Sequence, residues 1–400
     1  MFTELVIPAG RRPLTASEAR ISAILGTIIT LILLAAVVDQ YSVRSLSVLF
    51  LVLFWVPMLV VHELGHAVVA RLLGWRVREI VIGFGRDLWQ WQVGDTRVRI
   101  KLAPVEGYVL PAPAEPDNVR LKSMLIYAAG PGAELLVLGF MLLALGWDAV
   151  FSDSDEVSLI AAQSLAIVIL FGAGFNLLPF RTDGAVSDGL GILSSPFMNR
   201  ETIELRLLTF ELREIRKLLD AGKTGKAVQA LSEHLEKYPE NEGLRLMYVS
   251  ALSADEQDEA ARTLARERLA DAGLPDSRQR EWLHLQAEIE LHAAEPSWLV
   301  LDLALRKALA ITPKAPDLIA TKGASLVLRG QCEEGGNMVA HAWRANDGSA
   351  DDATMLAYLT VAAHRCRDGD ASERFRQAFE QVNRSRALRS RVDRLTGHPG

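Results

Sequence analysis

The side chains most able to do chemistry in this sequence stand together at residues 61–70, VHELGHAVVA, inside an apolar run. A helix turns by about 100° per residue, so His62 and His66 lie one turn apart on one face, where both imidazoles can reach a single metal ion. Glu63 lies on the adjoining face. This spacing is typical of zinc hydrolases, in which two histidines bind Zn²⁺ and a glutamate accepts a proton from the attacking water.

The segment around this motif is apolar enough to cross a membrane. Residues 45–60 contain no charged side chain, and Arg71 is the first charge after the motif. At about 1.5 Å per residue, His66 lies roughly 7 Å and His62 roughly 13 Å below the level of Arg71. Ionisable groups at that depth cost several kcal/mol unless they are compensated, so they indicate a functional site. The alternative is a chance HExxH, which would also have to fall by accident inside a spanning helix.

A catalytic zinc site needs a third protein ligand besides the two histidines. Residues 175–190, FNLLPFRTDGAVSDGL, form an apolar helix that is broken at Pro179 and followed by Asp183 and Asp188, each before a glycine. A carboxylate just past the helix break would lie at the same depth as His66. The alternative is an ordinary polar helix terminus. These residues alone leave both aspartates open as the third ligand.

Four apolar segments are long enough to span a membrane, at residues 21–38, 45–73, 124–145 and 157–180. The first could instead be a signal peptide, but the residues after it lack a small-residue cleavage site, so we expect a retained anchor. Residues 1–20 are then a short cytoplasmic leader. Pro57 predicts a kink one turn before the histidine motif.

The charges between these segments predict their orientation. Residues 71–122 hold nine Lys or Arg against six Asp or Glu, whereas residues 147–158 hold four acids and no base. The basic loop should therefore be cytoplasmic, together with the N-terminus and everything after residue 181. We expect a multi-pass protein of the cell membrane, namely a bacterial inner membrane.

The basic loop also contains a hairpin signal. Gly94 and Asp95 form a two-residue turn that pairs Trp91 with Val98, with Trp89 opposite Ile100 on the same face. Such a hairpin could lie on the lipid headgroups, offer an edge to an extended peptide by strand addition, or simply pack on the helices.

Four motifs in this order resemble those of the site-2 protease family of intramembrane zinc metalloproteases. They are HELGH at 62–66, KLAPVEGYV at 101–109, AAGPGAELL at 128–136, and NLLP at 176–179 followed by Asp-Gly. The resemblance covers residues 45–190. It implies a metalloendopeptidase that hydrolyses peptide bonds within or next to transmembrane segments of membrane proteins, in regulated intramembrane proteolysis.

The same resemblance implies roles for single residues. His62 and His66 would ligate Zn²⁺, Glu63 would activate the water, and Asn176 would orient the loop or the scissile carbonyl. The third ligand would be Asp188, because Ser-Asp-Gly followed by an apolar helix is similar to the longer-loop members, with Asp183 as the alternative.

Two positions depart from the family pattern. Glu134 stands where asparagine is common, and Glu106-Gly107 stands where Gly-Gly is common. A glutamate inside a membrane needs a partner or a proton, so Glu134 either pairs with a basic group or touches the site.

The second half of the chain is charged and shows helical periodicity without strand patterns. Gly222, Ala227, Leu231 and Pro239 stand at offsets that resemble the tetratricopeptide repeat, and a second such passage ends at Pro313. Stacked repeats would form a solenoid with a peptide-binding groove, and the alternative is a generic helical bundle.

The whole sequence therefore predicts a mainly α-helical protein in three parts: a leader at 1–20, a transmembrane zinc protease domain at 21–195, and a cytoplasmic helical-repeat domain at 196–400. Its partners would be a membrane-protein substrate, the lipid bilayer, and a peptide or protein at the repeats. A net charge of −6 argues against a nucleic-acid surface. The competing hypothesis is a catalytically inactive membrane scaffold that binds partners through its repeats.

Overall fold

The computed structural model describes residues 46–152, 154–182, 185–345, 353–383 and 386–397. The expected leader and first span lie outside these residues. The chain divides into two compact units, one that ends at Thr209 and one that begins at Phe210. The sequence placed the domain boundary at residues 195 and 196. In the structure, residues 196–209 instead pack with the first unit.

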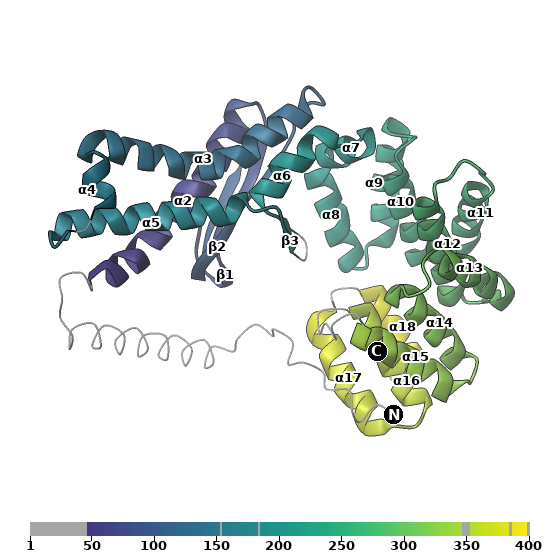
Figure 1. The fold of residues 1–400 in the computed structure, drawn as a ribbon. Coiled ribbons are helices and arrows are strands. Elements are labelled where there is room, and N and C mark those ends of the chain that lie inside the picture. The colour runs from purple at the N-terminus through teal and green to yellow at the C-terminus, as the bar shows by residue number, and fades with distance from the viewer. Residues whose placement is uncertain (1–45, 153, 183–184, 346–352, 384–385, 398–400) are drawn as a thin grey trace. The chain divides into compact units, whose positions relative to one another are not determined.

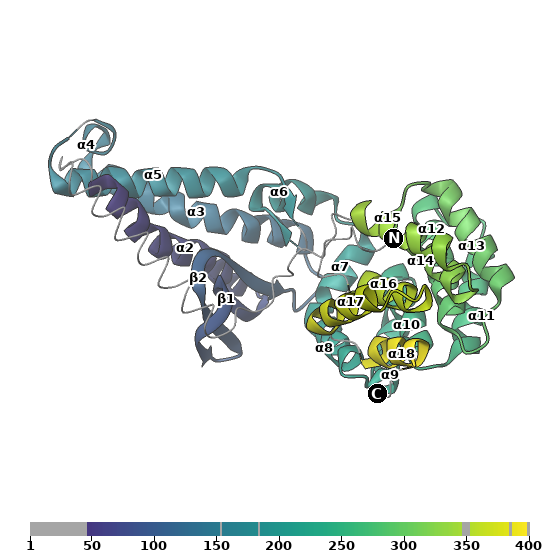
Figure 2. The ribbon, with the colours of Figure 1, turned by 90° about the horizontal axis from the view of Figure 1, so that it is seen from below.

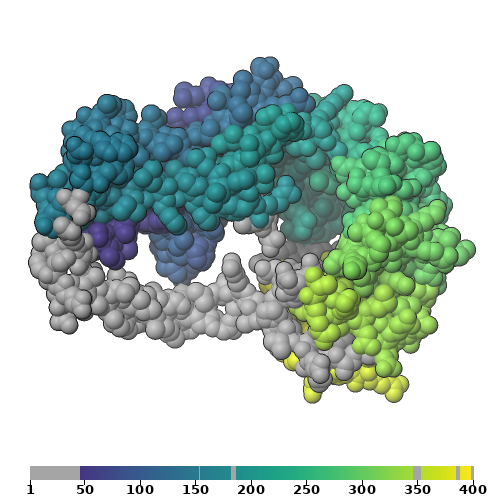
Figure 3. Space-filling model, in the orientation of Figure 1, coloured from purple at the N-terminus to yellow at the C-terminus, as the bar shows by residue number. Residues whose placement is uncertain are grey.

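Among the described residues, three helices of the first unit are long and apolar enough to cross a membrane. They are α2 (Leu46–Leu72), α3 (Val119–Leu145) and α5 (Val157–Leu177), and their bounds agree with three of the four expected spans. Each packs against the other two, as the two ribbon views show (Figures 1 and 2). In the space-filling view, the side chains of α3 and α5 form one continuous layer (Figure 3). The short helix α4 (Trp147–Phe151) lies between them in sequence.

A small antiparallel sheet follows α2. It consists of β1 (Arg76–Val93) and β2 (Thr96–Ala112), and the predicted register is confirmed, since Trp91 faces Val98 and Trp89 faces Ile100. Both strands are longer than a simple hairpin requires, and they fold back on themselves. Val81 in the first half of β1 pairs with Arg99 on one side and with Tyr108 on the other.

The fold-back of β1 follows from its sequence. Gly83 and Gly85 have φ of 93° and 87°, a region that glycine enters without strain, so the strand bends there. Val77, Ile80 and Ile82 before the bend are buried, whereas Trp89 beyond it is exposed. The first half of β1 therefore becomes the centre of the sheet, and the last part of β2 becomes one of its edges.

Short elements close the first unit after α5. They are β3 (Arg181–Thr182), β4 (Ala185–Val186), α6 (Asp188–Ser194), the 3₁₀ turn η2 (Ser195–Phe197) and α7 (Arg200–Leu207). Ser187 caps α6, because its Oγ accepts from Leu190 N. The same hydroxyl accepts from Phe180 N at 3.0 Å and donates to Leu178 O at 2.6 Å. One serine therefore holds the start of α6 against the end of α5.

The second unit is helical throughout its described residues. Its helices are α8 (Thr209–Asp220), α9 (Thr224–Lys237), α10 (Glu242–Ala254), α11 (Asp258–Leu269), α12 (Asp276–His292), α13 (Trp298–Ile311), α14 (Pro316–Leu328), α15 (Cys332–Ala345), α16 (Ala353–Arg365), α17 (Gly369–Val382) and α18 (Arg386–Thr396). Consecutive helices pack closely in the pairs α12 with α13, α14 with α15, and α16 with α17.

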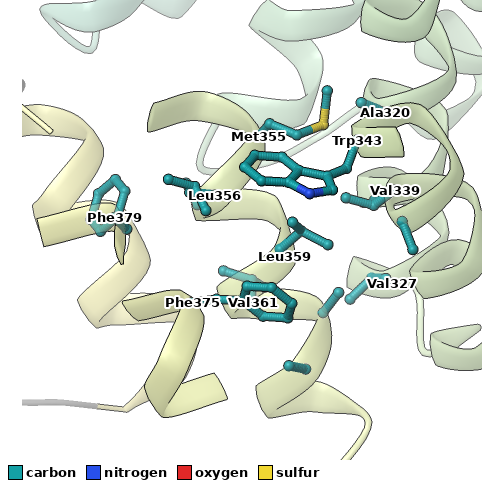
Figure 4. Close-up of a cluster of buried hydrophobic side chains, with 14 of the residues drawn as sticks. Ala320, Val327, Val339, Trp343, Met355, Leu356, Leu359, Val361, Phe375 and Phe379 are labelled. Atoms are coloured by element: carbon teal, nitrogen blue, oxygen red, sulfur yellow. The ribbon is translucent and has the colours of Figure 1, made fainter. Parts of the chain in front are cut away.

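The core of this unit combines large apolar side chains with many alanines. Figure 4 shows Trp343 of α15 beside Met355 and Leu359 of α16, with Phe375 of α17 in the same cluster. Of the residues that resembled a tetratricopeptide repeat, Ala227 and Leu231 are buried in α9. The repeat architecture itself stays a prediction.

Candidate metal centre

Three side chains from two elements of the first unit converge on one point. His62 and His66 come from α2, and Asp188 is the first residue of α6. His62 Nε2 lies 3.1 Å from Asp188 Oδ2 and 3.1 Å from His66 Nε2, which in turn lies 3.4 Å from Asp188 Oδ1. In a tetrahedral zinc site with bonds of about 2.0–2.1 Å, neighbouring ligand atoms are about 3.3–3.4 Å apart. The three side chains therefore have the spacing that one Zn²⁺ requires, and they form a possible metal site.

The remaining ring nitrogens support this assignment. His66 Nδ1 lies 2.6 Å from the carbonyl oxygen of Ile126, so this nitrogen must carry the proton and donate it. His62 Nδ1 lies 3.2 Å from Glu134 Oε2, which is also an acceptor. With both Nδ1 atoms protonated, both Nε2 atoms present lone pairs to the carboxylate of Asp188. Three electron-rich groups repel one another at this distance, and a cation between them removes the repulsion.

Helix α3 approaches this cluster at Gly130. A Cβ atom at that position would lie 2.3 Å from His66 Nε2 and 2.7 Å from His62 Nε2. Any side chain there would therefore occupy the space in which the two imidazoles meet a metal ion. The AAGPGAELL segment thus places its glycine, and no larger residue, beside the histidines.

Glu63 is buried between α2 and the sheet. A Cβ atom at Gly107 in β2 would lie 2.7 Å from Glu63 Oε1, so the carboxylate rests against the backbone of this strand. Glu63 also lines the same cavity as His62, His66 and Asp188. The structure thus brings the predicted base and the predicted ligands to one space.

This cavity has a volume of about 1390 Å³. Small-molecule pockets measure roughly 300–1,000 Å³, so there is room here for an extended stretch of peptide. Its walls include Asn176 at the end of α5, Glu134 of α3, and the β2 segment at 105–111. Asn176 thus lines the same cavity as the predicted metal ligands. Asp183, the alternative third ligand, lies outside the described residues.

The position of α6 depends on contacts that the sequence gave no means of finding. The ring of Tyr127 packs on Gly191, where a Cβ atom would lie 2.5 Å from the ring. Arg206 of α7 donates to Tyr127 Oη at 3.2 Å and to Ser123 Oγ at 3.3 Å. Helix α7 therefore holds α3, and α3 in turn supports the helix that carries Asp188.

Comparisons with known proteins agree with this geometry. A model of peptidase family M50 matches residues 49–252. The zinc metalloprotease RasP of Oceanobacillus iheyensis is 37% identical over 75 residues, which are 19% of this chain and 18% of that protein. RasP of Bacillus licheniformis is 32% identical over 76 residues, again 19% of this chain and 18% of that protein. A protein of Clostridium perfringens is 28% identical over 132 residues, or 30% of this chain and 39% of that protein.

The matched part spans less than two-fifths of the length of each of these relatives. The family match is broader, since it covers just over half of this chain and includes both histidines and Asp188. The chain belongs to peptidase family M50.

Proposed function

We propose that this protein is a zinc-dependent endopeptidase that hydrolyses peptide bonds of membrane proteins within or next to their transmembrane segments. The observation that carries the proposal is the convergence of His62, His66 and Asp188, whose ligand atoms lie within 4.8 Å of one another in a cavity that Glu63 also lines. The same helix that bears both histidines is long and apolar enough to cross a membrane.

In the proposed reaction, His62, His66 and Asp188 hold Zn²⁺. When bound there, Zn²⁺ would act as a Lewis acid, which polarises the peptide carbonyl and lowers the pKa of water. Glu63 accepts a proton from the attacking water as its oxygen bonds to the carbonyl carbon, and it returns a proton to the amine as the C–N bond breaks. Asn176, at the cavity wall, orients the scissile carbonyl.

We propose that the substrate binds as an extended strand along β2. Residues 107–110 pair with β1 on one side, and this segment also forms part of the cavity wall beside Glu63. Their other edge has no strand partner among the described residues. A peptide added there would have its backbone held by main-chain hydrogen bonds close to the metal cluster, which requires that a substrate helix first unwinds locally.

The topology and the second unit complete the proposal. We infer a multi-pass protein of the cell membrane whose basic loop and C-terminal helices face the cytoplasm, so that cleavage releases a cytoplasmic fragment in regulated proteolysis. The C-terminal helices would act as tetratricopeptide-like repeats that bind a substrate tail or a regulator.

The test uses the purified full-length chain in proteoliposomes with a model single-span substrate. Glu63→Gln should lower turnover by about 10²–10⁴-fold, because it removes the proton acceptor, while zinc content stays unchanged. Glu156→Gln, at the start of α5 and outside the cavity, serves as the control. Unchanged turnover in Glu63→Gln would reject the enzyme mechanism and favour a scaffold that binds partners without cleaving them.

A further inference from the structure

Glu134 is a buried carboxylate that the proposed reaction does not use. It lies within the membrane-length helix α3, and only 3% of its surface is exposed. Among the described residues no Lys or Arg lies within ion-pair distance of it, and its one charged or polar partner there is His62. A buried carboxylate in such a place is costly unless a partner compensates its charge.

The contact between the two residues is specific to one ring nitrogen. Glu134 Oε2 lies 3.2 Å from His62 Nδ1, the nitrogen that faces away from the metal cluster. In the described part of the chain neither atom has a hydrogen-bond partner of good geometry, and both are shielded from solvent. Their approach has the distance of an ion pair but not the angle of an ideal hydrogen bond. Each atom therefore depends on the other for its only polar contact.

The two ligating histidines differ in what lies behind them. His66 Nδ1 donates to the neutral carbonyl oxygen of Ile126, whereas His62 Nδ1 faces the carboxylate of Glu134. A carboxylate behind a metal-ligating histidine fixes the ring and makes its other nitrogen a stronger ligand. His62 should accordingly be the stronger of the two imidazole ligands.

The carboxylate is also confined from its far side. A Cβ atom at Gly172 of α5 would lie 3.1 Å from Glu134 Oε1, which is tighter than an ordinary contact. Glu134 thus lies between the ligand-bearing helix α2 and α5, with little freedom to turn away from His62. A methyl group added at Gly172 would crowd the carboxylate, so Gly172→Ala should affect the metal site through Glu134.

We infer that Glu134 is a positioning residue, which orients His62 and strengthens the hold of the site on Zn²⁺. This inference rests on the proposed function only in taking His62, His66 and Asp188 to be zinc ligands.

The test measures zinc affinity of the full-length chain by competition with a chromogenic chelator, in the absence of any substrate. Glu134→Ala should weaken zinc binding by about 10–100-fold, and Glu134→Gln by less, because its amide keeps a polar group of the same size beside His62 and loses only the charge. The absorption spectrum of the Co²⁺-loaded protein should shift in the same order. Glu79→Gln is the matched control, since it changes an equally buried glutamate that pairs with Arg99 at 2.8 Å.

If Glu134→Ala does not fold, Glu134→Gln and Gly172→Ala still decide the question, and both should weaken zinc binding relative to Glu79→Gln. Zinc affinities within about twofold of the unchanged chain for these variants would overturn the inference. The outcome is separate from that for cleavage. Zinc binding that depends on Glu134 in a chain without peptidase activity would reject the protease alone, whereas cleavage with zinc binding indifferent to Glu134 would reject the positioning role alone.

Discussion

The two units of this protein differ in the large apolar side chains that they expose and in the ionisable groups that they bury. Among its described residues the first unit buries two histidines and five carboxylates, while large apolar residues such as Leu143 and Phe140 are 86% and 70% exposed on its surface. The second unit encloses Trp282 and Trp343, which are 0% and 2% exposed. A surface that faces lipid can be apolar at no cost, whereas ionisable groups inside a membrane unit are costly and indicate a functional site. A surface that faces water leaves the apolar residues to the core.

Both units contain buried glutamates, and Glu290 and Glu134 differ in the partners that compensate their charge. Glu290 in the second unit is fully buried, and it accepts from Arg262 at 2.9 and 3.1 Å and from Ser297 N at 2.9 Å. These contacts with Glu290 raise the pKa of Arg262 above its usual value. Glu134 has a metal-site histidine in place of such an arginine. A buried carboxylate whose donors are an arginine and a backbone N–H stabilises the fold. A buried carboxylate beside a candidate metal-ligating histidine can instead tune the metal site.

The largest effect is expected when the space between α3 and the histidines is filled. Gly130→Ala would place a methyl group 2.3 Å from His66 Nε2, so we expect loss of stoichiometric zinc and of any cleavage. Gly132→Ala is the matched control, because a Cβ atom there meets nothing within 4 Å. Zinc content per chain, measured by atomic emission after gel filtration, gives the answer. Full zinc content in Gly130→Ala would mean that the metal lies elsewhere.

Removal of the proposed third ligand should come next in size. Asp188→Ala leaves two imidazoles, too few for a stable catalytic zinc site, so zinc should be lost on dialysis against a weak chelator. Asp183→Ala should retain its zinc. Retention by Asp188→Ala together with loss by Asp183→Ala would move the assignment to Asp183.

The opposite outcome is expected when the buried pair of the second unit is broken. Arg262→Ala leaves Glu290 without its cation and should destabilise the helical unit by about 3–5 kcal/mol, with zinc affinity unchanged. Urea unfolding followed by circular dichroism measures this, and Arg266→Ala, an exposed arginine on the same helix, is the control. A loss of zinc affinity in Arg262→Ala would show that the Arg262–Glu290 pair also affects the metal site, and would contradict its purely structural role.

The smallest effect concerns the contact that supports α6. Tyr127→Phe removes the hydroxyl that accepts from Arg206 at 3.2 Å, and a hydrogen bond to a charged donor contributes about 1.5–3 kcal/mol. We expect a lower melting temperature and a faster release of zinc, since α6 carries Asp188. Tyr248→Phe in α10 controls for the substitution itself. Zinc release at the unchanged rate would confine Tyr127 to a packing role.

Some of this organisation is determined by the sequence itself. The sequence predicted the bounds of α2, α3 and α5 within a few residues. It also predicted that the Gly94-Asp95 turn pairs Trp91 with Val98 and Trp89 with Ile100. These features depend on hydrophobic runs, alternation and turn residues, which are local in the chain. The spacing of His62 and His66 likewise required only that the segment be helical.

Other features depend on contacts between residues that are far apart in the chain. The place of Asp188 beside the histidines depends on a capped helix 122 residues after His66, and the partner of Glu134 depends on how α3 crosses α2. The bend of β1 is local, at Gly83 and Gly85, but the pairing of Val81 with both Arg99 and Tyr108 of β2 is non-local. Periodicity predicts which face of a helix is polar, but the side chains that two faces bring into contact are settled only when the helices pack, here at Gly130.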